Sequence, residues 1–314
     1  MTHTLTIDEV NLIRSSVRQV LATTGPALVP SALVEMGWPD LVQDAPADSF
    51  TVLTEEAGRA RSVAPVADLA VVWGAGLGSQ PTTAVMIDGL VLSGAERAER
   101  FLCLSTDLST AVPSMHLVDA SAVSLQPVQG FDPALGLSRA TVELSSAEGV
   151  ANASGAIAAG RRALASQMVG ACEQMLTETL AYVNERHQYG RAIGSFQTVK
   201  HRLADVKVAT TAAKAAVAVA WKVAESDGSD DDATTLSIAA KVLAGRAQQL
   251  ASTHCFQVHG GIAFTVEHGF QQWVRRGLLL DLLLGGNDQL TVELGNRLIA
   301  QGRVPRVPNL WQRT

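Results

Sequence analysis

The sequence predicts a mainly α-helical protein with a small β domain, an α+β fold with helices in both terminal parts of the chain. Long alanine-rich stretches with apolar residues three and four positions apart run over about 152–185 and onward from 196. A middle stretch, about 81–144, instead holds short β-branched runs separated by Gly, Pro and Asp. Hydrophobic residues make up 47% of the 314 residues but aromatic residues only 4%, so we expect the helices to pack closely through small side chains.

An N-terminal helical domain is expected over residues 1–78. Thr6 and Glu9 have the Thr-x-x-Glu spacing of a capping box that begins the first helix. Trp38-Pro39 is expected to follow the end of the second helix, because proline blocks helix continuation. Glu55 and Arg59, spaced i,i+4, are explained by an ion pair on a helix surface. The further helices predicted here cover residues 31–36, 48–60 and 65–74.

A shortened β domain is expected over 79–146 and a bundle of four or five helices over 147–314. The predicted strands cover residues 84–89, 90–94, 101–104 and 140–144. The predicted bundle helices cover 152–185, 196–225, a segment after the acidic loop 226–232, 266–283 and 287–301, and an extended tail follows from 304. The second of these helices has a near-heptad apolar seam, and a seam left uncovered in one chain is expected to form an oligomer interface.

Charge and cysteine content exclude several classes of protein. The net charge is −6 and no basic run occurs, so neither nucleic acid nor a membrane surface is an expected partner. The first nine residues lack the basic and apolar regions of a signal peptide, and no apolar run reaches about 18 residues, so a cytoplasmic protein is expected. The cysteines fit no CxxC spacing and are expected to be reduced thiols; they are Cys103, Cys172 and Cys255.

The stretch Glu185–Gln197 separates two long helical patterns and carries two interrupting glycines. Arg186 falls at a helix end, where its planar guanidinium can fork onto two phosphate oxygens. Tyr189 and Phe196 offer aromatic faces for a flavin or adenine ring. A local alternative stays open for Arg186, which can also pair with the last carbonyls of its own helix.

A second break, Gln257–Ala263, holds two adjacent glycines. Gly260 and Gly261 would let the backbone approach a pyrophosphate closely, and nearby N–H groups suit phosphate oxygens. A plain helix C-cap explains the same pair of glycines. His259 could titrate near neutrality but is explained as a loop histidine. With His254 it lacks the i,i+4 spacing of two metal ligands on a helix, and no metal site is expected.

Together these stretches resemble the acyl-CoA dehydrogenase family, which carries Arg-x-x-(Phe/Tyr)-Gly, then Phe-Gln, and later Gln-x-x-Gly-Gly in its C-terminal bundle. The segments Met-Gly-Trp-Pro and Glu-Glu-x-Gly-Arg are also similar to its N-terminal domain. The resemblance implies a helical domain, a middle β domain that holds the flavin ring, and a bundle that reaches the ADP half of a neighbouring subunit's FAD. The FAD contacts that it implies are Arg186, Gln188, Tyr189, Phe196, Gln257, Gly260 and Gly261.

The chain departs from the family pattern where catalysis is expected. The middle domain lacks the Thr-Glu-Pro segment, and the strand that contacts the flavin is missing between Gly94 and Phe101. Dehydrogenation needs a carboxylate to remove the α proton of the acyl group. The two positions where the family keeps this glutamate are Gly285 and Gly160 here, so no catalytic residue is assigned. Asp288 could substitute, although it also suits a helix N-cap.

The resemblance implies a noncatalytic subunit of a heteromeric acyl-CoA dehydrogenase, as in actinobacterial steroid side-chain degradation. A full-length sister subunit would supply the catalytic glutamate, the flavin-ring site and most contacts to the acyl-CoA, in an α2β2 tetramer. The expected substrate is a steroid side-chain CoA thioester, and the expected electron acceptor is similar to electron-transfer flavoprotein. Two alternatives stay open: a self-sufficient homomeric dehydrogenase with an atypical base, and a structural paralogue without flavin.

Overall fold

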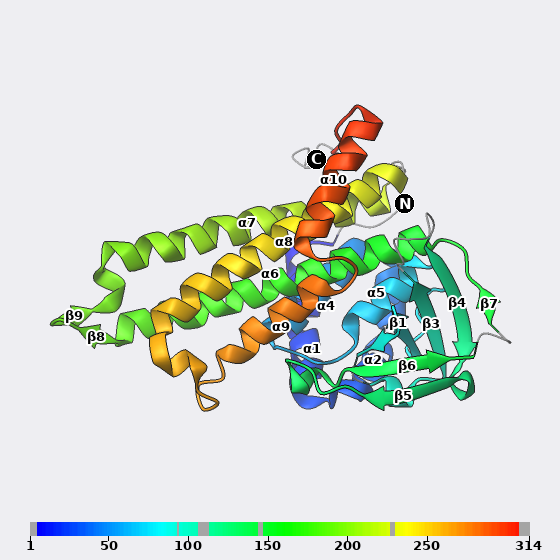
Figure 1. Cartoon of the computed structure of the whole chain (residues 1–314), viewed down its shortest axis with the longest axis horizontal. Coiled ribbons are helices and arrows are strands. Elements are labelled where there is room, and N and C mark those ends of the chain that lie inside the picture. The colour runs from blue at the N-terminus through cyan, green and yellow to red at the C-terminus, as the bar shows by residue number, and fades with distance from the viewer. Residues whose placement is uncertain (1–4, 93, 106–112, 144–146, 227–229, 308–314) are drawn as a thin grey trace.

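The computed structural model describes residues 5–92, 94–105, 113–143, 147–226 and 230–307. Helices at both ends of the chain enclose one edge of a curved sheet, and three long helices extend away from it (Figure 1). The mainly helical fold with a small β domain is therefore confirmed. The predicted extended tail lies from residue 308 onward outside the described residues.

The N-terminal helices are α1 (Ile7–Thr23), α2 (Val29–Glu35), α3 (Trp38–Asp44), α4 (Pro46–Arg59) and α5 (Val66–Gly74). The predicted capping box is confirmed, because the Thr6 hydroxyl accepts from Glu9 N–H and the Glu9 carboxylate accepts from Thr6 N–H. The prediction that the second helix ends before Trp38-Pro39 is confirmed, because α2 ends at Glu35; Trp38 and Pro39 instead begin the next helix, α3. Pro39 is in the first turn of α3, where a backbone N–H has no helical partner to lose.

Among the described residues, the sheet has seven strands in the order β5-β6-β2-β1-β3-β4-β7. Only β1 and β3 are parallel; the other neighbours are antiparallel. The strands are β1 (Thr83–Ile87), β2 (Leu90–Val91), β3 (Arg100–Ser105), β4 (Ser114–Asp119), β5 (Val123–Pro127), β6 (Ser138–Val142) and β7 (Glu148–Gly149). Strands β4, β5 and β7 were not predicted, although Met115 and Leu117, and Val123 and Leu125, alternate with polar residues.

The bundle contains α6 (Ala153–Glu185), α7 (Gln197–Glu225), α8 (Asp230–His259), α9 (Gln271–Leu282) and α10 (Asn287–Gln301). The first three run side by side along the molecule, and α10 projects from its side (Figure 1). α9 begins later than predicted, because Gly260–Phe264 forms a 3-10 helix and Gly269 has a φ of +69°. The predicted apolar seam of α7 is buried inside this chain at Leu203, Val206, Ala213, Val217 and Ala220. These residues are therefore not left uncovered for the expected oligomer interface.

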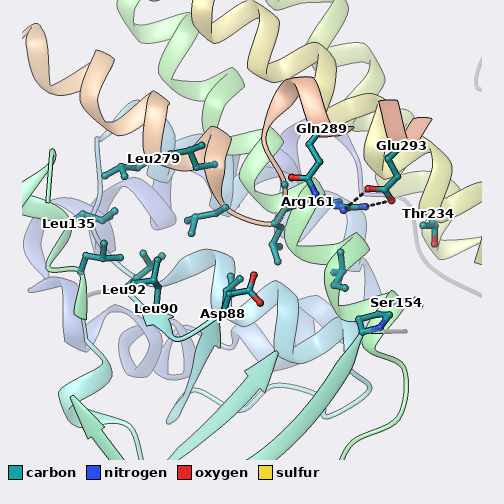
Figure 2. A pocket seen from close by; sticks show the side chains of 18 of the residues that line it. Asp88, Leu90, Leu92, Leu135, Ser154, Arg161, Thr234, Leu279, Gln289 and Glu293 are labelled. Atoms are coloured by element: carbon teal, nitrogen blue, oxygen red, sulfur yellow. Dashed lines mark hydrogen bonds and ion pairs between the residues drawn. The ribbon is translucent and has the colours of Figure 1, made fainter. Parts of the chain in front are cut away.

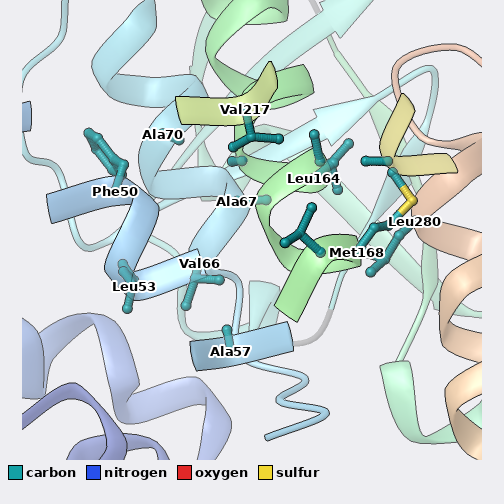
Figure 3. Packing of buried hydrophobic residues seen from close by; sticks show 14 of the residues in the cluster. Phe50, Leu53, Ala57, Val66, Ala67, Ala70, Leu164, Met168, Val217 and Leu280 are labelled. Carbon is teal, nitrogen blue, oxygen red and sulfur yellow. The ribbon is translucent and has the colours of Figure 1, made fainter. Parts of the chain in front are cut away.

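One continuous apolar core joins the N-terminal helices to the bundle. Phe50 and Leu53 of α4 and Ala70 of α5 lie in the same cluster as Met168 of α6 and Val217 of α7 (Figure 3). The two helical regions therefore share an interior, and the domain limits at residues 78 and 147 stay a prediction. A smaller core lies within the sheet around Phe101 and Cys103.

Glycines let α4 and α6 cross with their backbones in contact. A Cβ added at Gly170 would overlap the backbone oxygen of Glu55, and one added at Gly58 would overlap that of Gln167. We therefore expect Gly170→Ala to lower the free energy of unfolding by about 2 kcal/mol in denaturant titrations. Gly295→Ala, at a helical glycine with open space around it, should instead raise it by up to about 1 kcal/mol. Equal effects of the two substitutions would contradict this close crossing.

The predicted surface ion pair between Glu55 and Arg59 was wrong. Glu55 is 1% exposed and pairs with Arg14 of α1 at 3.3 Å and with Lys214 of α7 at 3.4 Å. Arg59 instead pairs with Glu173 of α6. These charges join four helices, so the i,i+4 spacing on α4 did not identify the partners.

All three cysteines are free and buried. In the part of the chain that the structure describes, no helix could span a membrane.

Candidate functional site

A pocket of about 870 Å³, called pocket 1, lies where the β1–β2 turn, the first half of α6 and the α9–α10 loop meet (Figure 2). Most of its wall is aliphatic, from Ile87, Leu90, Leu92, Leu135, Leu137, Ile157, Leu279, Leu282, Leu283 and Leu284. Its polar side contains Asp88, Arg161, Gln289 and Glu293. Such a lining suits a largely apolar ligand that carries a few polar groups at one side.

Arg161 fixes the polar side of pocket 1. Its Nη1 and Nη2 each donate to Glu293 of α10 at 3.1 Å, and its Nε donates to the Leu284 carbonyl at 3.0 Å. This bidentate pair aligns the Glu293 carboxylate and neutralises both charges. Arg161 is only 9% exposed, so it joins α6 to the α9–α10 loop and to α10 inside the protein.

The buried Lys241 of α8 holds the same loop from its other side. Its Nζ donates to the Asp281 carbonyl at 2.6 Å and to the Gly285 carbonyl at 2.7 Å. Burial lowers the pKa of Lys241 to about 7. The sequence analysis did not identify Lys241 or the Arg161–Glu293 pair. A lone lysine within the apolar run Ser237–Leu243 was the available signal.

The loop leaves no room for a carboxylate at either glycine where a base was sought. A Cβ at Gly160 would lie 2.7 Å from Val71 Cγ2 and would overlap Leu284 Cδ1. Gly285 has a φ of +104°, which L residues rarely adopt, and a Cβ there would lie 2.8 Å from Leu290 Cδ2. Leu284 therefore fills the space beside Gly160, and Leu290 fills the space beside Gly285.

Asp288, the alternative base, does not line pocket 1. It lies in the first turn of α10 and lines a second pocket of about 930 Å³ between α8, α9 and α10, called pocket 2. α10 starts at Asn287, so Asp288 is inside the helix rather than at its N-cap. The carboxylates that line pocket 1 in the described residues are Asp88 and Glu293.

The stretch after α6 forms a hairpin rather than a simple turn. β8 (His187–Gln188) pairs with β9 (Arg191–Ala192), and Tyr189 and Gly190 between them have φ values of +52° and +76°. Two positive φ angles are typical of a type I′ hairpin turn. Tyr189 is 93% exposed at the tip, and the Arg191 guanidinium lies 4.2 Å from the Phe196 ring centroid.

The end of α8 lies beside the end of α6. The His259 ring stacks on Tyr182 at a centroid distance of 4.4 Å, and its Nε2 lies 3.2 Å from the Thr179 hydroxyl. Gly260 follows with a φ of +66°, and open space surrounds both Gly260 and Gly261. The predicted FAD contacts are thus gathered at one end of the bundle, called the bundle tip, and are Arg186, Gln188, Tyr189, Phe196, Gln257, Gly260 and Gly261. None of them lines pocket 1 or pocket 2.

His259 should make stability at the bundle tip depend on pH. Its side chain is 5% exposed, and burial together with the nearby His268 lowers its pKa from 6.5 to about 4. Between these values the unfolded chain binds a proton that the folded chain does not, so stability falls as the pH falls from 6.5 to 4. The expected loss is about 3 kcal/mol at pH 4.

Denaturant titrations across this pH range check the expectation. His259→Phe, which keeps an aromatic ring against Tyr182, should flatten the acid limb of the stability curve. His201→Phe, at an exposed histidine of α7, should leave the limb unchanged. If the stability of His259→Phe still falls with pH as steeply as that of the wild-type chain, other groups cause the acid sensitivity.

Comparison with known proteins connects this geometry to one family. Residues 147–299 match the family model for the C-terminal domain of acyl-CoA dehydrogenases. This part of the chain is therefore similar to the C-terminal domain of acyl-CoA dehydrogenases. The acyl-CoA dehydrogenase IpdE2 of Mycobacterium tuberculosis is 34% identical over 174 residues, which is 54% of this chain and 50% of IpdE2. The acyl-CoA dehydrogenase FadE34 of the same organism is 38% identical over 127 residues, 40% of this chain and 17% of FadE34. The chain thus spans half or less of these relatives.

Solved structures with the acyl-CoA dehydrogenase fold superpose on nearly the whole chain. A variant of the Tcur3481–Tcur3483 steroid ACAD superposes with a TM-score of 0.77 at 21% identity, covering 94% of this chain and 98% of that one. The ChsE4–ChsE5 complex of Mycobacterium tuberculosis superposes with a TM-score of 0.72 at 18% identity, covering 95% and 99%. At this identity the likeness shows the fold alone, so the function has to be argued from the residues.

Proposed function

We propose that this chain is a cytoplasmic subunit of a heteromeric, FAD-dependent acyl-CoA dehydrogenase. In this proposal the bundle tip binds the ADP half of an FAD whose ring lies in a sister subunit. The sister subunit also supplies the catalytic glutamate and most contacts to the acyl-CoA. When bound, FAD accepts the β hydrogen of the acyl group as a hydride, and an acceptor similar to electron-transfer flavoprotein reoxidises it.

The separation of the two candidate sites within one chain carries the proposal. Arg161 of pocket 1 and Arg186 of the bundle tip lie near opposite ends of α6. At about 1.5 Å per residue, this places their Cα atoms roughly 37 Å apart. The two regions also lie far apart along the long axis of the molecule (Figure 1). A single FAD cannot use both regions of one chain, so the tip needs a site in another chain.

The chemistry of the bundle tip fits the ADP half of FAD. The Arg186 side chain is exposed and presents a planar fork that matches phosphate oxygens. The open backbone at Gly260 and Gly261 can approach a pyrophosphate, since no side chain stands in its way. Tyr189 offers a solvent-exposed aromatic face for stacking. These groups would orient and hold the cofactor but would take no part in proton transfer.

Pocket 1 supports the noncatalytic half of the proposal. Glu293 is held by Arg161, and Leu284 fills the space beside Gly160, so neither of these positions offers a free base. The other carboxylate of the lining, Asp88, lies exposed on the β1–β2 turn and matches neither family position of the glutamate. The aliphatic wall and the likeness to a steroid ACAD favour a steroid side-chain CoA thioester as the substrate of the assembly. Preference of the purified assembly for short straight-chain acyl-CoAs would exclude that substrate class.

Flavin stoichiometry tests the proposal. The chain is expressed alone and together with a sister dehydrogenase gene, and bound flavin is measured from the visible absorbance. The proposal requires a colourless chain alone and one FAD for each pair of unlike chains. A yellow homomer with one FAD per chain would support a self-sufficient enzyme instead. A stable assembly with no flavin would support a structural paralogue.

Variants of Arg186 locate the flavin contact within the assembly. Arg186→Ala is expected to weaken FAD binding about 10- to 100-fold, because a charged hydrogen bond to phosphate is lost. Arg186→Lys should recover part of the loss, because it keeps the charge but not the fork. Arg246→Ala, at an exposed arginine of α8, is the control and should bind FAD normally. Normal FAD binding by Arg186→Ala would show that the bundle tip does not contact FAD through this residue.

A further inference from the structure

A third pocket, called pocket 3, lies at the start of β1, whereas pocket 1 lies at its end, and the two share no lining residue. It has a volume of about 350 Å³ and is bounded by α2, the start of α5, the start of β1 and the segment after Gly94. Pro30, Pro65 and Pro81 line it, together with several alanines. The walls therefore combine short, rigid apolar side chains with polar groups, and the volume is less than half that of pocket 1.

One carboxyl group of pocket 3 is buried without a charged partner. Asp68, in the first turn of α5, is 5% exposed, and its Oδ2 accepts a hydrogen bond from Val85 N–H at 3.0 Å. It forms no ion pair with any residue that the structure describes. Burial consequently raises the pKa of Asp68 to about 7. A cation beside this carboxyl would favour its ionised form.

A second polar group in the same pocket has no partner at all among the described residues. Thr83 is 5% exposed, and its Oγ1 is buried without a hydrogen bond. Buried hydroxyls are rarely left unpaired in folded proteins, so the Thr83 hydroxyl, which lines the same pocket as the Asp68 carboxyl, is available to a bound group. Asp68 and Thr83 come from different elements, α5 and β1, which meet at this pocket.

We propose that pocket 3 binds a small organic cation, a primary ammonium group on a short apolar body. The ammonium would donate to the Asp68 carboxylate and to Thr83 Oγ1, since it has three donors and no acceptor. The proline and alanine walls would hold the apolar body. Arg97 is the other charged residue of the lining, and because its side chain is exposed, solvent screens its charge. This site is independent of the flavin and of a sister subunit.

Titration of the full chain with n-propylammonium chloride tests the site, with thermal stability and amide NMR shifts as readouts. Saturable binding is expected, whereas 1-propanol and sodium chloride at equal ionic strength should not reproduce it. Asp68→Asn, which keeps an acceptor for Val85 N–H, should weaken binding at least about 30-fold. Asp40→Asn removes the same charge from the exposed first turn of α3 and should leave binding unchanged.

Thr83→Val keeps the test decisive if Asp68→Asn does not fold. This isosteric change removes an unpaired buried hydroxyl, so the variant should be at least as stable as the wild-type chain. It should bind the ammonium about 10-fold more weakly, because one hydrogen bond is lost. Wild-type affinity in Thr83→Val or in folded Asp68→Asn would overturn the proposal. Binding of 1-propanol as tight as that of n-propylammonium, or no saturable binding of the cation, would do the same.

Discussion

Gly160→Glu, which places a carboxylate where a catalytic base was sought, is expected to lower the free energy of unfolding by about 4 kcal/mol or more. It is not expected to create a dehydrogenase. A side chain at residue 160 would overlap Leu284 Cδ1 and approach Val71 Cγ2. The new carboxylate would also be buried beside Arg161, which Glu293 already holds with two hydrogen bonds. Overpacking and an uncompensated buried charge therefore act together.

Denaturant titrations and an acceptor-reduction assay check this expectation. Gly160→Ala introduces only the overpacking and should cost about 1–3 kcal/mol, so the difference between the two variants measures the burial of the charge. A Gly160→Glu chain with wild-type stability that reduces an electron acceptor in the presence of an acyl-CoA would contradict the packing argument. It would equally contradict the noncatalytic assignment.

The long helices could be predicted because local signals set their ends. α10 covers the predicted residues 287–301, and Gly302 follows it with a φ of +63°, as expected for a helix C-cap. α6 begins one residue after the predicted start, where the Asn152 side chain accepts from Gly155 N–H. The residues that make these interactions lie within a few positions of the helix ends, so a local sequence pattern can predict them.

The candidate site was only partly predictable because its decisive contacts join distant segments. Nothing near Lys241 in the sequence indicates that it lies under the α9–α10 loop, bound to the carbonyls of Asp281 and Gly285. The absence of a glutamate at residues 160 and 285 was visible from the sequence, whereas the filling of those spaces by Leu284 and Leu290 was not. The β8–β9 hairpin was also read only as a turn, since two-residue strands carry no period.

The buried pair between Asp132 and Arg276 is expected to be the ionic contact whose disruption destabilises the chain most. Arg276 Nε of α9 donates to Asp132 Oδ2 at 2.6 Å, and the two residues are 7% and 4% exposed. The same arginine donates through Nη1 to the Ser62 carbonyl at 2.7 Å. Asp132→Ala should cost about 3–5 kcal/mol, because it leaves the guanidinium buried without its counterion. Asp231→Ala, which breaks the exposed pair with Arg297, should cost no more than about 1 kcal/mol.

Loss of this pair should also loosen the walls of pocket 1. Hydrogen exchange distinguishes this local effect from a general loss of stability. The loop that carries Asp132 continues to Leu135 and Leu137, and the helix that carries Arg276 continues to Leu279, so the pair ties two walls of pocket 1 together. In Asp132→Ala, amides of residues 134–137 and 277–283 should exchange faster under native conditions, while those of the bundle tip keep their wild-type rates. Uniform acceleration along the whole chain would mean that the pair supports global stability only. Unchanged exchange at both walls would mean that apolar packing alone holds pocket 1 in shape.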